Sequence, residues 1–467
     1  MNASGDCHRC GAWLPSAWFC SRPARSGRIP FEDARHLTAR IGFGLATADE
    51  IAELGPLDYT SAVDRLLDGV RRDSVTPPPE WVDEPTPDWR AIRTMDENAR
   101  AAFFKTLVER RLPLKMWWFG EMLQTDSPLT ERMVLFWHNH FTSSLNKVRW
   151  PHLLYHQNAL FRRLGTGNFA DLLRAMARDR AMLLYLDSQT NRVGQPNENF
   201  ARELLELFTL GEGQGYTERD IREAARAFTG WMVNPDTGEF TVTRRLHDTG
   251  EKTFLGRTGR FDGDDIIDIL LDQPRLAEHI SEKLWRAFVS DTPDAGAVRR
   301  LAAVFRDSGY ELRPTLRALF LSAEFRAPAS RGVLTKSPVD VVAGTLRFMG
   351  ALDIDRKKGV WVLRAMGQDL FDPPNVKGWP GGSIWITTET LSLRYQFLGR
   401  LSRGVEMAMT NGDGAPAKAM MSAPADQVNS RLRGLLLAVE PLDPPAPRAA
   451  PMTAIRLLLT DPAYQVK

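Results

Sequence analysis

The stretch that decides most about this chain is YLDSQTNRVGQPNENFARELLELFTLG, from Tyr185 to Gly211. Pro196 suits the first turn of a helix, because its missing N–H would be unpaired there anyway, and Gly211 suits a left-handed stop past the end. Apolar residues recur between them at helical spacing and form one stripe: Phe200, Leu204, Leu207 and Phe208. The stretch therefore predicts a helix of about four turns with one buried face.

Short polar side chains gather at the entrance of this helix and along its flank. They are Asp187, Asn191, Asn197, Glu198, Asn199 and Glu203. Glu203 is the candidate general acid/base, because a carboxyl at the rim of a core can exchange a proton with a substrate, and Glu198 and Asn199 would assist it. The same pattern also fits a structural role, in which Glu198 and Glu206 form surface ion pairs with Arg202, four residues from each.

Helical patterns dominate the rest of the chain as well. Amphipathic periodicity predicts helices at 32–43, 58–72, 96–112, 128–137, 263–272, 275–289, 294–307, 314–322, 338–350, 389–400 and 452–460. Phe240, Val242 and Arg244 alternate, with Gly250 as a turn, which predicts a hairpin within 238–254. The expected fold is mainly α: a multi-helical assembly with one small inserted β-hairpin.

Proline-rich and cysteine-bearing segments divide the chain. Residues 1–28 lack apolar periodicity and predict a disordered tail, whose three cysteines are one ligand short of the usual structural zinc site. These are Cys7, Cys10 and Cys20. Residues 29–410 form the expected helical domain, with a lobe boundary at the acidic, proline-rich connector 76–89. Residues 411–467 are expected to hold linker segments and C-terminal helices that pack back on the domain.

Composition excludes several classes of protein. The 467 residues are 43% hydrophobic and 25% charged with a formal charge of +2, as in an ordinary soluble globular protein. Lys and Arg are spread evenly among acidic residues, so nucleic acid is not an expected partner. The apolar runs are far shorter than the roughly 20 residues of a membrane span. The N-terminal residues lack the pattern of a secretory signal, so the sequence predicts a cytoplasmic location.

His138 and His140 in WHNHF are candidates for metal binding or proton transfer, because imidazole is a common metal ligand and titrates near neutral pH. Residues two apart on a helix diverge by about 200°, so both could bind one metal only if the helix ends between them. Asp187 or Glu203 would then complete the coordination from another segment. The alternative is two histidines satisfied in the core or at a helix end.

Two loops carry further binding candidates. His247 and Asp248 lie at the tip of the predicted hairpin, where they would either join the carboxylate cluster or form an ordinary polar turn. The loop PPNVKGWPGGSIW places Trp379 and Trp385 beside glycines, either as an aromatic platform or as core tryptophans. The remaining binding candidates are Asn191, Asn197 and Lys377.

No familiar cofactor or hydrolase motif occurs in the sequence. A GxxxxGK[ST] phosphate loop, a GxSxG elbow and an HExxH zinc motif are all missing. Asp262, Asp264 and Asp265 fit caps at a helix start better than calcium ligands, because the EF-hand spacing is absent. The sequence therefore leaves the cofactor unknown.

Six segments, in order, carry a family resemblance. They are LFWHNHFTSS (135–144), PNENFARELLELFTLG (196–211), REAARAFTGW (222–231), HDTGEKTFLG (247–256), FDGDDIIDILL (261–271) and PPNVKGWPGG (373–382). Over roughly residues 32–466 the chain resembles a bacterial family known as domain of unknown function 1800. The resemblance implies no particular activity. It does imply a sulfatase-like protein as a partner, and it gives export as the alternative location.

The functional expectation is a hydrolase that acts on a polar polymer or its ester groups through a carboxylate/His site. The alternative is a noncatalytic binding or accessory protein that works with a sulfatase-like partner and uses the Trp379 loop for recognition. An enzyme would require Asp187, Glu203 and the histidines to converge in one concave pocket. A binding protein would instead expose an apolar or aromatic surface.

Overall fold

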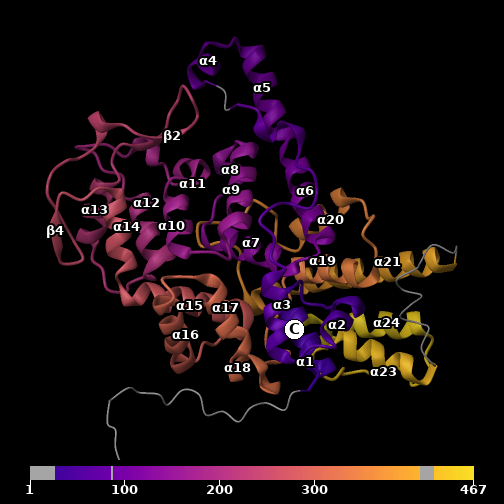
Figure 1. Ribbon diagram of the computed structural model, residues 1–467. Helices are drawn as coiled ribbons and strands as arrows, with labels where there is room; N and C mark the ends of the chain where they lie inside the picture. Colours follow the sequence, from indigo (N-terminus) through magenta and orange to yellow (C-terminus); the bar gives the residue numbers. More distant parts are fainter. Residues whose placement is uncertain (1–26, 86–87, 411–424) are drawn as a thin grey trace, which may run out of the picture.

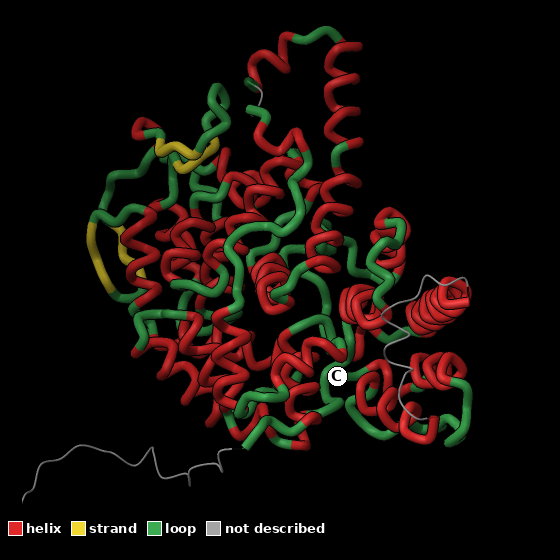
Figure 2. The backbone as a smooth tube through the Cα atoms, turned by 45° about the vertical axis from the view of Figure 1, so that its right-hand side comes forward, coloured by secondary structure: helices red, strands yellow, loops and turns green. Residues whose placement is uncertain are grey.

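The computed structural model is an assembly of helices with two very small β-hairpins (Figures 1 and 2). It describes residues 27–85, 88–410 and 425–467. The mainly α fold expected from the sequence is confirmed. The three cysteines of the N-terminal segment and the linker 411–424 lie outside the described residues.

Helix α7 lies inside the assembly and contacts helices from several parts of the chain. It begins at Pro128, whose fixed φ suits a first helical turn, and ends at His140. Nearly all of its side chains are buried, because α1, α6 and α9 all pack against it. The elements of this half of the chain are α1 (Phe31–Ile41), α2 (Ala48–Leu54), α3 (Tyr59–Asp68), α4 (Trp89–Thr94), α5 (Glu97–Glu109), α6 (Arg111–Gln124), α8 (Leu145–Val148), α9 (Pro151–Leu164), α10 (Phe169–Ala177) and α11 (Arg180–Tyr185).

Helices α4 and α5 project from the top of the molecule in Figure 1, whereas α15 to α18 pack together below α7. Buried hydrophobic side chains from Ile29 to Tyr464 form one continuous core. The elements after residue 210 are α13 (Glu218–Ala227), α14 (Gly263–Leu271), α15 (Pro274–Phe288), α16 (Ala295–Asp307), α17 (Leu312–Leu321), α18 (Ala323–Arg326), α19 (Pro338–Met349), α20 (Arg356–Ala365), α21 (Thr388–Thr410), α23 (Ala425–Leu436) and α24 (Pro451–Thr460).

The strands pair differently from the predicted hairpin. β1 (Trp231–Val233) pairs with β2 (Phe240–Val242), and β3 (Lys252–Phe254) pairs with β4 (Arg257–Gly259), both antiparallel. The expected pairing across Gly250 is therefore wrong, because Trp231 offers β2 a buried aromatic neighbour: its ring centroid lies 5.2 Å from that of Phe240. The assembly holds two small hairpins, and the residues between them form a connection.

The helix predicted after Pro196 begins later than expected. α12 spans Asn199–Glu203, and the Oδ1 atom of Asn197 accepts a hydrogen bond of 2.9 Å from the backbone N–H of Asn199. The chain then widens into a π-helix over Leu204–Thr209. Gly211 ends it with φ of +95°, as the sequence predicts. π-helical turns are rare and often lie at functional sites, so the residues around Leu204–Thr209 are candidates for a functional site.

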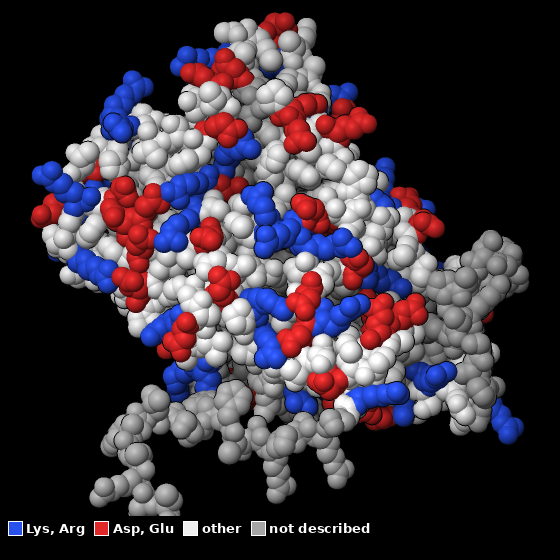
Figure 3. Space-filling model, in the orientation of Figure 1, with Lys and Arg blue, Asp and Glu red and all other residues white. Residues whose placement is uncertain are grey.

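The C-terminal helices α23 and α24 contact each other, and α24 contacts α21. α21 continues about ten residues beyond the predicted helix end. The final residues form a β-bridge between Thr335 and Val466, which brings Lys467 into the interior. Among the described helices, none has both the length and the apolar character needed to cross a membrane. On the face shown in Figure 3, acidic and basic side chains are interspersed.

Candidate functional site

His138 and His140 lie on different faces of α7. The helix continues through His140, so the condition for a shared metal, a helix end between the two histidines, is not met. Their rings contact different neighbours: Phe371 and Trp379 surround His138, whereas Phe208 and His279 surround His140. Nor do three His, Cys, Asp or Glu side chains form a metal-binding group anywhere in residues 27–85, 88–410 or 425–467.

His138 is fully buried among aromatic rings. The ring centroids of Trp118, Phe371 and Trp379 lie 5.2–5.4 Å from its own. Neither ring nitrogen has a hydrogen-bond partner among the described residues. Burial lowers the pKa of His138 from 6.5 to about 3, so the side chain is neutral at physiological pH. His138 is therefore a core histidine in this arrangement.

His140 contacts a lysine that the sequence did not single out. The Nζ atom of Lys283, on α15, lies 2.9 Å from Nδ1 of His140 and 3.1 Å from the carbonyl oxygen of Leu207. Leu207 belongs to the last turn of the π-helix, where backbone carbonyls lack helical partners, and His279 Nε2 lies 3.1 Å from the same oxygen. The end of α7, the π-helix and α15 therefore meet at Lys283.

Burial sets the protonation of this group. It lowers the pKa of Lys283 from 10.5 to about 8, and it lowers the pKa of His140 well below 6.5, with a smaller contribution from the Lys283 charge. Lys283 is thus partly neutral at mildly alkaline pH, while His140 stays uncharged. A lysine that donates to Nδ1 leaves the imidazole proton on Nε2.

Asn139 fastens the KGWPGG loop to the end of α7. Its Oδ1 atom accepts a hydrogen bond of 2.6 Å from the backbone N–H of Trp379. Gly378 stands at φ of +88°, and a Cβ atom there would lie 2.6 Å from the carbonyl oxygen of Asn139. Only glycine permits this approach. The sequence motifs WHNHF and KGWPGG are therefore neighbours in the fold.

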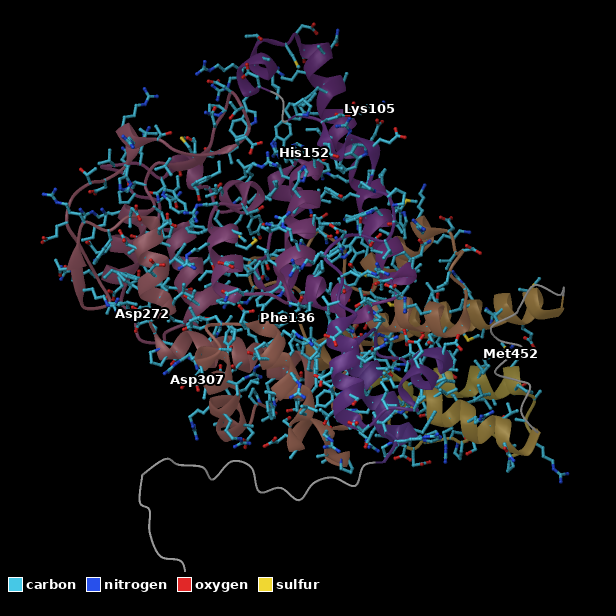
Figure 4. The ribbon with its side chains drawn as sticks, in the orientation of Figure 1. Lys105, Phe136, His152, Asp272, Asp307 and Met452 are labelled. Atoms are coloured by element: carbon cyan, nitrogen blue, oxygen red, sulfur yellow. The ribbon has the colours of Figure 1, made fainter. Side chains whose placement is uncertain are left out.

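A cavity of about 630 Å³ opens between these elements. Phe136, labelled in Figure 4, lines it, and so do His140 and Lys283. The other polar or aromatic residues on its wall are Arg132, Asn139, Arg286, Asp291, Thr335, Ser337, Asp340, Gln368, Lys377, Trp379, Ser383, Trp385 and Lys467. His140, Lys377, Trp379 and Trp385 are the sequence-predicted site residues that line it.

Glu203 and Asp187 do not line this cavity. Glu203 is half-buried, and its pKa is raised by desolvation and by the nearby Glu206 carboxylate, while Lys377 opposes the rise. Asp187, at φ of +59°, pairs with Lys147 at 2.8 Å, and Asn199 Nδ2 approaches the same carboxylate oxygen at 3.5 Å. The carboxylates and the histidines therefore do not share one pocket.

The remaining polar groups around α12 connect elements. Arg202 pairs with Glu198 at 3.0 Å and with Glu206 at 3.3 Å, the ion pairs anticipated from their spacing. Asn191 donates to the carbonyl of Ala225 at 2.9 Å and accepts from the backbone N–H of Asn197 at 3.0 Å. These contacts hold the entrance of α12 against α13.

His247 and Asp248 lie in the connection between the two hairpins. His247 Nδ1 is 2.9 Å from the carbonyl oxygen of Thr229, and Asp248 pairs with Arg226 at 2.8 Å. Arg226 holds the pKa of Asp248 below its ordinary value. Both side chains bind the end of α13, which is the ordinary polar turn rather than an extension of the Glu203 cluster.

Trp379 and Trp385 are buried in the cavity wall, with exposed fractions of 4% and 5%. They do not form an exposed platform. In the same loop, Ile384 is 65% exposed, and Lys377 pairs with Glu212 at 3.0 Å.

Lys283 and His279 were missed from the sequence, although one signal was available. They stand four residues apart, and therefore on one face, in the correctly predicted α15 helix. No local sequence pattern pointed to the other charged group in the cavity wall, because its members meet only through the tertiary fold. These are Arg132, Asp340 and Lys467.

The chain matches the family model described as "Protein of unknown function (DUF1800)" over residues 36–466. No curated protein and no solved structure matches the chain. The six motifs noted in the sequence fall within the matched range, and three of them supply the end of α7, the π-helix and the Trp379 loop. With nearly the whole chain covered, this protein belongs to the DUF1800 family.

Proposed function

We propose that this protein is a hydrolase that cleaves ester groups of a polar substrate bound in the cavity, with Lys283 and His140 in place of the carboxylate/His site expected from the sequence, whose groups do not share one pocket. The observation that carries the proposal is the contact between Lys283 Nζ and His140 Nδ1 at the cavity wall. A lysine whose pKa is lowered toward neutrality, placed beside a neutral histidine in a concave site, has the properties of a general base.

The reaction would use Lys283 to move one proton. Neutral Lys283 accepts a proton from a water molecule as the water oxygen bonds to the ester carbonyl carbon. The bond from that carbon to the alcohol oxygen then breaks, and the Lys283 ammonium returns the proton to the leaving alcohol. The products are a carboxylic acid and an alcohol, and no other reactant is required. His140 orients Lys283 through its Nδ1 atom and is a positioning residue.

Two cationic side chains on the same wall, Arg286 and Lys377, favour the negative charge that develops on the carbonyl oxygen. Lys377 also lies within electrostatic range of Glu203. The sequence made Glu203 the acid/base candidate. We instead assign it an electrostatic role: its carboxylate stabilises the positive charge of Lys377 at the cavity edge. Glu198 and Asn199 would hold the α12 entrance through Arg202 and Asp187.

The alternative is an accessory protein that recognises a sulfatase-like partner through the Trp379 loop. Ile384 is the exposed hydrophobic side chain that would favour such contact. Trp379 and Trp385 face the interior, so the loop offers a partner less aromatic surface than the sequence suggested. The accessory function therefore has weaker support than the cavity.

The test is acid release, followed by pH-stat, from aryl esters and O-acetylated polysaccharides incubated with the full chain. Parent protein should release acid, and Lys283→Met should reduce the rate at least about a hundredfold. Lys105→Met is the matched control, because Lys105 is an exposed lysine on α5 (Figure 4). Equal rates in parent and Lys283→Met, or no release from any ester, would overturn the proposal.

A further inference from the structure

The cavity wall carries more positive than negative side chains. Five lysines and arginines line it, against two aspartates: Arg132, Lys283, Arg286, Lys377 and Lys467 against Asp291 and Asp340. This imbalance contrasts with the whole sequence, in which 60 basic and 58 acidic residues nearly cancel. A concave site with low-dielectric walls focuses the field of such charges onto its contents.

Asp340 is shared between two of these cations. Its Oδ1 atom accepts from Arg132, and its Oδ2 atom accepts from Lys467 at 2.7 Å. Oδ2 also accepts from the backbone N–H of Ser337 at 2.9 Å and from the Ser337 hydroxyl at 3.0 Å. One carboxylate therefore serves two basic groups, the Arg132 guanidinium and the Lys467 amine.

Two further guanidinium groups near Asp340, those of Arg40 and Arg394, form no ion pair with a carboxylate of the described residues. Arg40 donates to the carbonyl oxygens of Phe288 and Val289, and Arg394 donates to those of Lys336 and the Gln465 side chain. Carbonyl oxygens satisfy N–H groups but do not neutralise charge. These guanidinium groups add to the positive field at the cavity.

Lys336 is a buried amine whose Nζ atom has no hydrogen-bonded anion among the described residues. It is 1% exposed, its Nζ atom makes no hydrogen bond with the described residues, and it lies 3.7 Å from the centre of the Tyr464 ring. Burial and the neighbouring positive charges hold the pKa of Lys336 far below 10.5, and burial with Arg132 lowers the pKa of Lys467 to about 7. Such crowding is relieved when an anion binds nearby.

We infer that the substrate of this cavity carries an oxyanion, a phosphate, sulfate or carboxylate group, which binds against Arg132 and Lys467. The inference rests on the proposed function, because it names the substrate class for the same cavity. Guanidinium and ammonium groups form charge-assisted hydrogen bonds with oxyanions, and the wall places one of each beside Asp340.

The experiment measures anion binding without turnover. Sodium phosphate, sulfate and acetate are titrated in turn into the full chain at constant ionic strength set with sodium chloride, and binding is followed by calorimetry and by melting temperature. At least one anion should bind saturably and raise the melting temperature. The three arms identify which oxyanion the site prefers.

Two variants test the location. Lys467→Met should weaken binding at least about tenfold, while Asp340 keeps Arg132 as its partner. Ser383→Glu places a carboxylate on the wall from an exposed position and should also weaken binding, without touching the buried charges. Lys105→Met should bind as the parent does. These variants keep the test decisive even if Lys467→Met folds poorly.

The outcomes separate this inference from the hydrolase proposal. Saturable binding that both variants weaken supports the oxyanion site, even if no ester is cleaved. Binding that is unchanged in Ser383→Glu and Lys467→Met, or no saturable binding of any of the three anions, overturns it. Cleavage of neutral esters without anion binding would leave the hydrolase and remove the anionic substrate class.

Discussion

The Nζ atom of Lys283 lies 2.9 Å from Nδ1 of His140, although 143 residues separate them in the sequence. Lys283 extends from α15 to the end of α7 and also reaches the carbonyl of Leu207 in the π-helix. The carbonyl oxygen of Leu207 and the Nδ1 atom of His140 together hold Lys283 Nζ in place. The relationship ties two distant motifs, which contain His140 and Leu207, to one titratable group on α15.

Lys283→Met should remove the pH dependence assigned to Lys283 along with the activity. If neutral Lys283 is the base, kcat/KM of the parent rises with pH and levels off above about 8, the pKa to which burial lowers this side chain. Residual activity of the variant should lack this rise. A parent profile that is flat between pH 7 and 9 would contradict a role for Lys283 as base.

The free energy of unfolding of the parent should rise with pH relative to that of Lys283→Met. The pKa of Lys283 is about 8 in the folded protein and 10.5 for the ordinary side chain, so the unfolded chain binds more protons between these values. The parent therefore gains stability from this group as pH rises from 8 to 10.5. Urea unfolding should show that Lys283→Met lacks this gain, on the order of 1–3 kcal/mol, whereas Lys105→Met retains it. Parallel curves for parent and Lys283→Met would refute the lowered pKa.

Local signals predicted the elements that depend on neighbouring residues. Pro128 begins α7 and Gly211 ends the π-helix with a positive φ, as expected. Thr217 and Asp220 form a capping box at the start of α13, and Asp262 caps α14 as the sequence indicates. Each of these features is decided by side-chain and backbone groups within three or four residues, which the sequence displays directly.

The site itself depended on contacts that no local pattern contains. Whether α7 ends before or after His140 is a matter of one residue, and the tertiary packing extends the helix through it. The partner of β2 is β1 rather than β3, because Trp231 packs against Phe240. In the sequence, Lys283 is one residue of a predicted amphipathic helix, and only the tertiary fold places it beside His140.

Glu203→Gln separates the carboxylate cluster from the cavity. Glu203 does not line the cavity, so the amide variant should keep the fold and retain activity within about threefold of the parent, as expected for a group that acts through a neighbouring charge. Acid release by Glu203→Gln and by Lys283→Met, measured in one assay, shows whether the reaction takes place in the cavity or at the carboxylate cluster. A loss in Glu203→Gln as large as that in Lys283→Met would move the chemistry to the carboxylates.

His138→Leu should be as stable as the parent or more stable by up to about 2 kcal/mol at pH 7. The substitution nearly conserves volume and removes two buried nitrogens that have no hydrogen-bond partner among the described residues. Activity should be unchanged, because His138 does not line the cavity.

Acidification should widen the difference in stability between His138→Leu and the parent. The folded pKa of His138 is about 3, below the ordinary 6.5, so the unfolded chain binds more protons between these values. The parent loses stability from this group as pH falls from 6.5, at about 1.4 kcal/mol per pH unit, and His138→Leu does not. Thermal melts from pH 7 to 5 measure the difference. If His138→Leu is instead inactive and several kcal/mol less stable than the parent, His138 makes an interaction that both the fold and the activity need.

Gly378→Ala should destabilise the protein by about 2–4 kcal/mol and detach the Trp379 loop from α7. Gly378 lies at φ of +88°, and the added methyl group would collide with the side chain and carbonyl of Asn139. Gly381→Ala is the matched control three residues away, because no atom lies within 4 Å of its Cβ position and its φ of −121° suits any residue. Urea unfolding of the two variants isolates the effect of the clash. Since Trp379 and Lys377 both line the cavity, Gly378→Ala should also weaken binding there, and more than Gly381→Ala, which adds a methyl group to the cavity wall without a clash. Equal stability of the two alanine variants would mean that the loop does not depend on its docking to Asn139.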